Sequence, residues 1–296
     1  MDPDVGLERL LSLRQHQQDG RRSPHKPLLV LLALAALRDA GSSAMSWHDT
    51  RDRLSALLSE FGPPSRTGAK QSAAYPFTRL RSDGVWLLDQ ELSMDLVGPL
   101  DDANPTGRLA PGIEAELLRR PGLLEQTARE LVESQFPSTL IPDVLQAVGL
   151  ELELGEHLVK VGRHRSASWR ALILESWDRS CAFCGYDGQL GGAPVGLEAA
   201  HVRWFNHDGP DVADNGLALC SLHHKLFDRG ALGLDGQMRV KVASVYGART
   251  DQGRAVYDLH ERELRPRPGT ALPAERHVAW RDREVFKGEP LVATNA

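Results

Sequence analysis

The feature that most constrains this chain is a pair of short knuckles, Cys181-Ala-Phe-Cys184 and Cys220-Ser-Leu-His223. All three cysteines of the 296-residue chain fall in these knuckles. Three thiolates and one imidazole form the tetrahedral ligand set that zinc prefers, and four protein ligands leave no open position. The sequence therefore predicts a structural Zn²⁺ site, with buried free cysteines beside a surface histidine as the alternative.

The remaining composition is that of a globular protein. Apolar residues make up 41% and charged residues 25% of the chain, whose length suffices for two domains. The longest apolar run, Leu28 to Leu37, suits a buried helix and is too short to span a membrane. The first ten residues lack the pattern of an export signal, and an odd number of cysteines argues against a disulfide framework. We therefore expect a cytoplasmic protein with no membrane partner.

Charge restricts how the chain could bind nucleic acid. The net charge of −5 argues against a protein that coats DNA indiscriminately, so any contact must come from local basic patches. The first patch contains Arg14, Arg21, Arg22 and Lys26. The second contains Lys160, Arg163, Arg165 and Arg170. Since a charge run is usually a solvated face, neither patch alone identifies a phosphate contact.

Hydrophobic periodicity predicts a mixed α and β first half. Helices are expected at Val5–Gln18, Pro27–Ala40, Thr50–Glu60, Ile113–Arg119, Leu123–Gln135 and Ser138–Ala147. Strands are expected at Tyr75–Leu80 and Val85–Leu88, joined into a hairpin by Asp83-Gly84, with a loop at Asp101–Gly112. In the second half we expect a helix at Ser168–Asp178, a hairpin of Leu232–Gly236 and Met238–Ala243, and irregular chain thereafter.

Further polar residues surround the knuckles, in the runs Glu198-Ala-Ala-His201, Asn215-Gly-Leu-Ala-Leu-Cys220 and His223-His224-Lys-Leu-Phe-Asp228. Over about 60 residues, roughly 168 to 230, this arrangement closely resembles the HNH nuclease family in its zinc-finger-supported form. The resemblance implies a ββα-metal fold. It places His201, Asn215 and His224 on the three positions that name the family. It also implies a small core of Phe205, Leu217, Leu219 and Phe227.

The residue types suit hydrolysis of a phosphodiester. His201 can act as the general base, because neutral imidazole has a pKa near working pH. Asn215 would stiffen the loop and orient His201. His224 would bind a catalytic divalent cation, Mg²⁺ or Mn²⁺, and Asp228 four residues later would project from the same helical face as a second ligand. Many relatives carry Asp or His where this chain has Ala200, so either Glu198 or Asp228 would have to substitute.

The N-terminal half contains a second candidate site. In Ser23-Pro-His25-Lys26-Pro27 the prolines fit a helix start, which would set His25 and Lys26 at a positive helix N-terminus, a natural anion site. A buried helix with proline at its start and solvated neighbours is the alternative interpretation of the same residues.

The run from Arg22 to Leu29, together with Tyr75-Pro-Phe-Thr-Arg79-Leu, resembles the sulfur-binding domain of phosphorothioate-dependent, McrA-like restriction endonucleases. The resemblance implies that Tyr75 and Pro76 form an apolar dent for sulfur, beside His25, Lys26, Pro27 and Arg79. It also implies an arginine upstream (Arg14, Arg21 or Arg22) and contacts from a later loop (Thr106 or Arg108). Sulfur is larger, softer and less hydrated than oxygen, so an apolar dent discriminates between them. Without the second motif, Tyr75 and Pro76 would be an ordinary start of a strand.

We therefore predict an α+β protein with an N-terminal mixed α/β sulfur-binding domain (1–150) and a basic linker (151–167) with DNA contacts at Arg163 and Arg165, continued by Arg170. An HNH endonuclease domain would occupy 168–296. The expected partner is phosphorothioate-modified double-stranded DNA. Cutting both strands requires two passes or two protomers, so a homodimer is one expected arrangement. The alternatives are an HNH nuclease that reads modified bases, for which the N-terminal half has few aromatic residues, and a non-catalytic zinc-finger regulator.

Overall fold

The computed structural model describes residues 8–13, 23–64, 72–93, 95–150 and 167–292. The predicted DNA contacts at Arg14, Arg21, Arg22, Arg163 and Arg165 lie outside these ranges. The chain divides into two compact units, the first comprising Met1–Phe136 and Ile141–Glu153 and the second Pro137–Leu140 and Leu154–Ala296. Within the described ranges, every helix is too short or too polar to cross a membrane.

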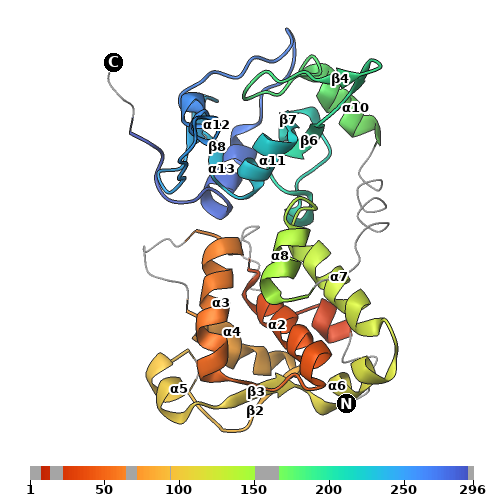
Figure 1. Cartoon of the computed structure of the whole chain (residues 1–296), viewed down its shortest axis with the longest axis vertical. Helices are drawn as coiled ribbons and strands as arrows, with labels where there is room; N and C mark the ends of the chain where they lie inside the picture. Colours follow the sequence, from red (N-terminus) through yellow and green to blue (C-terminus); the bar gives the residue numbers. More distant parts are fainter. Residues whose placement is uncertain (1–7, 14–22, 65–71, 94, 151–166, 293–296) are drawn as a thin grey trace. The chain divides into compact units, whose positions relative to one another are not determined.

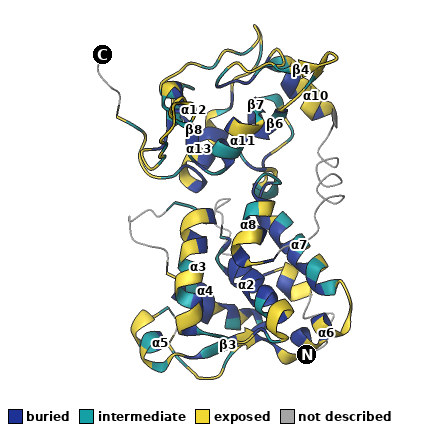
Figure 2. Ribbon diagram, viewed as in Figure 1, coloured by how far each residue is buried: buried dark blue, intermediate teal, exposed yellow. Residues whose placement is uncertain are grey.

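The first unit is built around α2 (His25–Ala40), which Figure 2 draws dark blue along most of its length. Its run of aliphatic residues is apolar on all sides, so the helix must be enclosed by other elements. The elements that contact it most are α3 (Trp47–Phe61), α4 (Ala74–Arg79), α7 (Leu123–Gln135) and α8 (Ile141–Val148), as Figure 1 shows. This arrangement holds the start of α2 against α4.

Local sequence signals account for these helices. Proline occupies the position before α2 and its third residue, where a missing N–H costs nothing, and Gly41 ends the helix at φ 69°. Ser46 caps α3 by accepting a hydrogen bond from the Asp49 N–H. The predicted helices at 27–40, 50–60, 113–119, 123–135 and 138–147 are confirmed by α2, α3, α6 (Pro111–Arg119), α7 and α8.

The predicted hairpin of residues 75–88 is wrong. Residues 74–79 form α4 and residues 80–83 a 3-10 turn, because Pro76 fits the first turn of a helix and the Thr78 hydroxyl donates to the Ala74 carbonyl. Phe77 and Leu80, three positions apart, are both fully buried, which is helical and not strand spacing. Only β2 (Trp86–Leu88) forms as a strand.

The partner of β2 is β3 (Thr106–Leu109), which lies inside the segment expected to be a loop. The antiparallel sheet has the order β1-β3-β2, with β1 (Met45–Ser46) on the other side of β3. Gly107 permits the close approach of the buried Trp86 ring, since a Cβ at this position would lie 2.3 Å from the indole. The short α5 (Val97–Ala103) precedes β3.

The second unit contains a ββα arrangement. Strand β6 (Leu197–His201) pairs antiparallel with β7 (Gly216–Cys220), in a register from Leu197 opposite Cys220 to His201 opposite Gly216. Helix α11 (Ser221–Asp228) follows β7 directly and packs on the hairpin, which α10 (Ala167–Ser176) also contacts. The predicted ββα fold of this segment is therefore confirmed.

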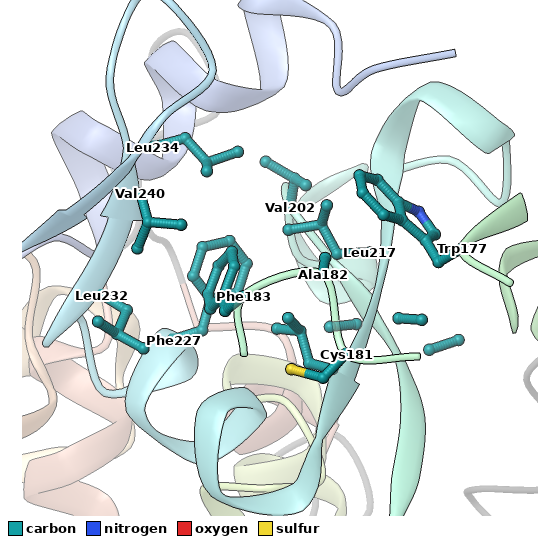
Figure 3. Packing of buried hydrophobic residues seen from close by; sticks show 14 of the residues in the cluster. Trp177, Cys181, Ala182, Phe183, Val202, Leu217, Phe227, Leu232, Leu234 and Val240 are labelled. Atoms are coloured by element: carbon teal, nitrogen blue, oxygen red, sulfur yellow. The ribbon is translucent and has the colours of Figure 1, made fainter. Parts of the chain in front are cut away.

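The core beneath this hairpin is shown in Figure 3, where the rings of Phe183 and Phe227 lie face to edge with centroids 5.5 Å apart. Leu217 and Leu219 are also fully buried, as expected from the resemblance. Phe205 was expected in the same core, but it is 55% exposed because it lies in the loop after the strand.

Beyond the ββα segment, β8 (Leu232–Leu234) and β9 (Val240–Val242) form the predicted hairpin. A smaller hairpin joins β4 (Gln189–Leu190) to β5 (Ala193–Pro194). The last segment was expected to be irregular, yet it contains α12 (Asp251–Arg254) and α13 (Glu275–Glu284). Periodicity misses α13 because three of its five buried residues are polar: His277, Arg281 and Glu284.

Candidate active site

The four predicted zinc ligands come together. The ligand atoms of Cys181, Cys184, Cys220 and His223 all lie within 4.8 Å of one another. Cys181 and Cys184 come from the loop after α10, Cys220 from the end of β7, and His223 from the first turn of α11. A soft sulfur-rich donor set at this spacing fits a four-coordinate metal ion.

The crowding of the thiols has an electrostatic consequence. Contacts from Cys184 and Cys220 lower the pKa of Cys181 far below its usual value, while contacts with Cys181 and Cys184 raise the pKa of Cys220. The cluster therefore favours a negative charge on Cys181. A bound cation would stabilise the thiolates that metal ligation requires, because its positive charge offsets their mutual repulsion.

The two faces of the β6–β7 hairpin carry different candidate residues. Side chains of a strand alternate between faces, so Glu198 and Ala200 share one face and His201 lies on the other. Glu198 contacts His224 of α11, whereas the His201 ring stacks on Trp169 of α10. The hairpin therefore presents Glu198 to α11 and His201 to α10.

His201 is held by two residues that the sequence did not mark. Its ring is stacked on that of Trp169, with centroids 3.9 Å apart and planes 14° apart. Its Nε2 lies 2.7 Å from Oδ1 of Asp211. Trp169 also donates from its indole to the carbonyl of Val212, the residue after Asp211. The ring is only 5% exposed, so its orientation is fixed by these contacts.

Asn215 closes the loop between β6 and β7. Its side-chain nitrogen donates to the carbonyls of Arg203 and Pro210, and its oxygen accepts from the Arg203 N–H. Gly209 lies at the tightest point, where a Cβ would come within 1.8 Å of the Arg203 carbonyl oxygen. This loop carries Asp211, so the amide of Asn215 holds in place the segment that contacts the His201 ring.

On the opposite face, Glu198, His224 and Asp228 form one chain of contacts. Nδ1 of His224 lies 2.6 Å from Oε2 of Glu198, and its Nε2 lies 3.2 Å from Oδ2 of Asp228. Burial disfavours the charged ring, but the charges and hydrogen bonds of Asp228 and Glu198 outweigh it and raise the pKa of His224 to about 9. The Glu198 side chain is 43% exposed, so this end of the chain is open to solvent.

Asp228 lies at the buried end. Its Oδ1 accepts from the indole N–H of Trp204 at 2.8 Å and from Arg281 of α13 at 3.2 Å. Burial opposes ionisation of Asp228, but the positive charges of His224 and Arg281 lower the pKa of its carboxyl. Ala200 is fully buried on the same hairpin face as Glu198, which brings a carboxylate to His224 from two residues earlier.

The first unit brings part of the predicted DNA-binding set together at the junction of α2 and α4. The His25 and Tyr75 rings meet edge to face at 5.9 Å, and the Arg79 guanidinium lies 5.3 Å from the centre of the Tyr75 ring. Arg79 also forms a two-pronged ion pair with Asp95. Pro27 of α2 and Pro76 of α4 are both buried.

The other predicted residues of the first unit have different surroundings. Lys26 is buried and forms an ion pair with the buried Asp83 at 2.5 Å. Thr106 and Arg108 lie on β3, where the Thr106 N–H donates to Asp89 and the Arg108 side chain pairs with Glu114. In the second unit, Arg170 is exposed on α10 and donates to the Leu197 carbonyl.

Each of the two sites lies in a segment that matches a known protein family. Residues 4–153 match the family described as "ScoMcrA-like, DNA sulfur-binding domain", which is half of the chain. The chain belongs to this family. Its ScoMcrA-like domain contains the His25, Tyr75 and Arg79 group. Residues 181–235 match the HNH endonuclease family, so the ScoMcrA-like domain is followed by an HNH endonuclease domain. The chain is therefore a DNA nuclease by class.

Several solved structures are similar to parts of this chain. The "Sulfur binding domain of ScoMcrA complexed with phosphorothioated DNA" is 21% identical, with a TM-score of 0.40, over 52% of this chain and 97% of that one. The "Structure of the Type IV phosphorothioation-dependent restriction endonuclease ScoMcrA" is 13% identical, with a TM-score of 0.37, over 74% of this chain and 81% of that one. The search of curated proteins found no match.

Proposed function

We propose that this chain is a restriction endonuclease that recognises phosphorothioate-modified double-stranded DNA through residues 1–150 and hydrolyses phosphodiester bonds through residues 168–296. The observation that carries the proposal is the held imidazole of His201, between Trp169 and Asp211, in an HNH domain that follows a ScoMcrA-like domain. A general base must be kept in one orientation, and these two contacts hold the ring in this way.

In this mechanism His201 is the base. The Asp211 carboxylate accepts from Nε2–H, which directs the lone pair of the neutral ring to Nδ1, where we place the proton taken from the attacking water. Once the ring is protonated, its charge is stabilised by Asp211 and by the indole face of Trp169. Asn215 contributes by fixing the loop that supplies Asp211.

A divalent cation, Mg²⁺ or Mn²⁺, supplies a Lewis acid that stabilises negative charge on the phosphorane and the departing oxygen when it is bound. Glu198 would be the accessible ligand for such an ion, because its carboxylate is partly exposed, and His224 beside it would join as a ligand once its ring loses a proton. Asp228 remains a predicted ligand, but its buried oxygens already contact Trp204, Arg281 and His224, so we assign it the task of holding the His224 ring. We assign zinc to the Cys₃His cluster, with a structural role.

Recognition of sulfur would take place where α2 meets α4. The half-buried Tyr75 would provide apolar surface that suits a weakly hydrated sulfur atom, with the buried Pro76 next to it in α4. An oxygen placed there would lose its water without compensation. His25 and Arg79 both contact the Tyr75 ring and supply donors for the remaining negative charge of the linkage. Arg22, Thr106 and Arg108 remain predicted contacts of the flanking DNA.

The test is cleavage of two matched DNA duplexes, identical except for one phosphorothioate linkage, with Mg²⁺ or Mn²⁺ present. We expect metal-dependent cutting of the sulfur-containing duplex and little cutting of its partner. Equal cutting of both would reject the sulfur specificity and leave an HNH nuclease that reads another feature. Binding without cutting under every metal condition would favour the non-catalytic zinc-finger protein. The molar mass of the protein in solution, alone and with the sulfur-containing duplex, tests the predicted homodimer.

A further inference from the structure

A single buried side chain joins the parts of the nuclease domain that carry the candidate base and the candidate metal ligands. Arg281 lies on α13, beyond residues 181–235 that match the HNH endonuclease family. Its side chain is 3% exposed. Its Nη1 donates to the carbonyls of His201 and Val202, at 3.2 and 2.9 Å, and its Nη2 donates to Asp228 at 3.2 Å.

These three acceptors lie in two parts of the domain. The carbonyls of His201 and Val202 lie at and just after the end of β6, and Asp228 is the last residue of α11. Asp228 in turn contacts Nε2 of His224 on the preceding turn of α11. A rigid planar fork that binds all three acceptors fixes the backbone of the base relative to the helix that carries His224.

The environment of Arg281 excludes an alternative role at the surface. Its guanidinium carbon lies 3.2 Å from the centre of the buried Phe227 ring. The end of α13 is anchored next to α11, because the Lys287 N–H donates to the Gly230 carbonyl and a Cβ at Gly230 would come within 2.0 Å of the Val285 carbonyl oxygen. Burying a charged group is costly unless hydrogen bonds and an opposite charge compensate it, and here the two carbonyls and the Asp228 carboxylate do so through Nη1 and Nη2.

We propose that Arg281 is a positioning residue of the nuclease centre, which sets the distance between the His201 backbone and the Asp228–His224 pair. The inference rests on the proposed function, since it concerns the same hydrolysis. It also means that the 181–235 segment depends on the C-terminal helix for an active geometry, although the zinc ligands, the base and His224 all lie within or next to that segment.

The test compares Arg281→Met and Arg281→Lys with wild type and with Arg283→Met, an exposed arginine on the same helix. Cleavage is measured in single turnover at saturating protein, with DNA affinity measured separately in Ca²⁺. We expect Arg281→Met to cut about 100-fold more slowly with DNA affinity within about twofold of wild type, because a displacement of about 1 Å costs this much in rate. Arg281→Lys keeps the charge without the fork and should recover part of the rate, and Arg283→Met should cut like wild type.

A purely structural role would give a different result. Activity would then fall only with the folded fraction, measured by thermal unfolding and zinc content, and lysine would restore the rate no better than methionine. That result, or an Arg281→Met that cuts within about threefold of wild type per folded molecule, overturns the proposal. If Arg281→Met does not fold, Trp204→Phe takes its place, because it keeps an aromatic ring in the core and removes the indole N–H donated to Asp228.

For Trp204→Phe we expect a slower cleavage step at unchanged DNA affinity, and a wild-type rate overturns the proposal. Asp228→Asn combined with Arg281→Met should be no slower than the slower single variant, because both changes interrupt one chain of contacts. Failure of wild type to cut any DNA counts against the proposed function, whereas active wild type with equally active variants counts against this inference alone.

Discussion

The two candidate sites differ in how their polar side chains are held. In the nuclease domain, His201, His224 and Asp228 are each at most 5% exposed and are bonded to one another or to Trp169, Asp211 and Arg281. In the ScoMcrA-like domain, Tyr75 is half-buried and the Arg79 side chain is 46% exposed. Proton transfer needs groups fixed to within a fraction of an ångström, whereas a surface that reads DNA needs groups the ligand can reach.

Lys26 does not follow this division. It belongs to the DNA-binding set predicted from the sequence, yet its ion pair with Asp83 is as buried as the contacts in the nuclease domain. The comparison therefore makes different predictions for changes in the two sites: loss of rate or of folding where groups are buried, and loss of selectivity where they are exposed.

The largest effect should come from the Cys₃His cluster. Cys184→Ser removes one ligand from a site at which about 10 kcal/mol or more of metal-binding free energy is coupled to folding. We expect the second unit to lose its cooperative unfolding transition and its bound zinc while the first unit unfolds as in wild type. Calorimetry and metal analysis measure both, and a chelator added to wild type should reproduce the change. Full zinc content with an unaltered transition would remove Cys184 from the ligand set.

His201→Ala should have the next largest effect and should act on rate alone. Loss of a general base typically slows a reaction by about 10² to 10⁴-fold, and the base adds little to the affinity for uncut DNA. We expect slower single-turnover cleavage at unchanged affinity. Asp211→Asn, which keeps a hydrogen-bonding side chain but removes the charge, should slow cleavage by a smaller factor. A His201→Ala variant that cuts within about tenfold of wild type would contradict the assignment.

How far the sequence predicted these sites depends on the range of the interactions. The predicted zinc ligands, together with His201, Asn215 and His224, fall in short runs whose spacing follows from one hairpin and one helix. Asp211 and Trp169 contact His201 through a loop and a preceding helix, so no spacing reveals them. Asp211 could have been suspected only because its loop, residues 208–214, holds three acidic residues.

The errors have the same origin. Residues 75–80 alternate in a way that suits a strand, but Phe77 and Leu80 are both fully buried by tertiary contacts, which favours the helix. The helix α13 buries Arg281, His277 and Glu284, which a hydrophobic pattern counts as exposed. Polar residues buried by long-range contacts are invisible to periodicity, and in this chain they include Arg281, which we infer to be a positioning residue of the active site.

Lys26→Met tests the exception in the first unit. Removing one partner of a buried ion pair leaves Asp83 uncompensated and typically costs about 3–5 kcal/mol. We expect the free energy of unfolding of the first unit, measured in urea, to fall by this amount. Adding Asp83→Asn to the Lys26→Met variant should restore part of that stability. The variant could instead unfold like wild type while the slope of log binding constant against log salt concentration falls by about one unit. That result would mean that Lys26 breaks its ion pair with Asp83 and contacts phosphate when DNA binds.

The smallest effect in free energy should be the most selective one. Tyr75→Ala removes the exposed apolar surface between His25 and Arg79 without touching a buried charge. Affinity for phosphorothioate DNA should fall by about tenfold, or about 1.4 kcal/mol, and affinity for the unmodified duplex by much less. Fluorescence anisotropy at several salt concentrations measures both affinities.

Tyr75→Phe is the matched control, because it keeps the ring that Arg79 covers and should retain the preference for sulfur. Arg79→Gln supplies the opposite change: it removes a charge beside the ring, so it should weaken both duplexes alike and reduce the salt slope by about one unit. The pair separates contact with sulfur from attraction to phosphate, since one variant changes the ratio of the two affinities and the other changes their salt dependence. Equal losses on both duplexes for Tyr75→Ala would place sulfur recognition elsewhere in the first unit.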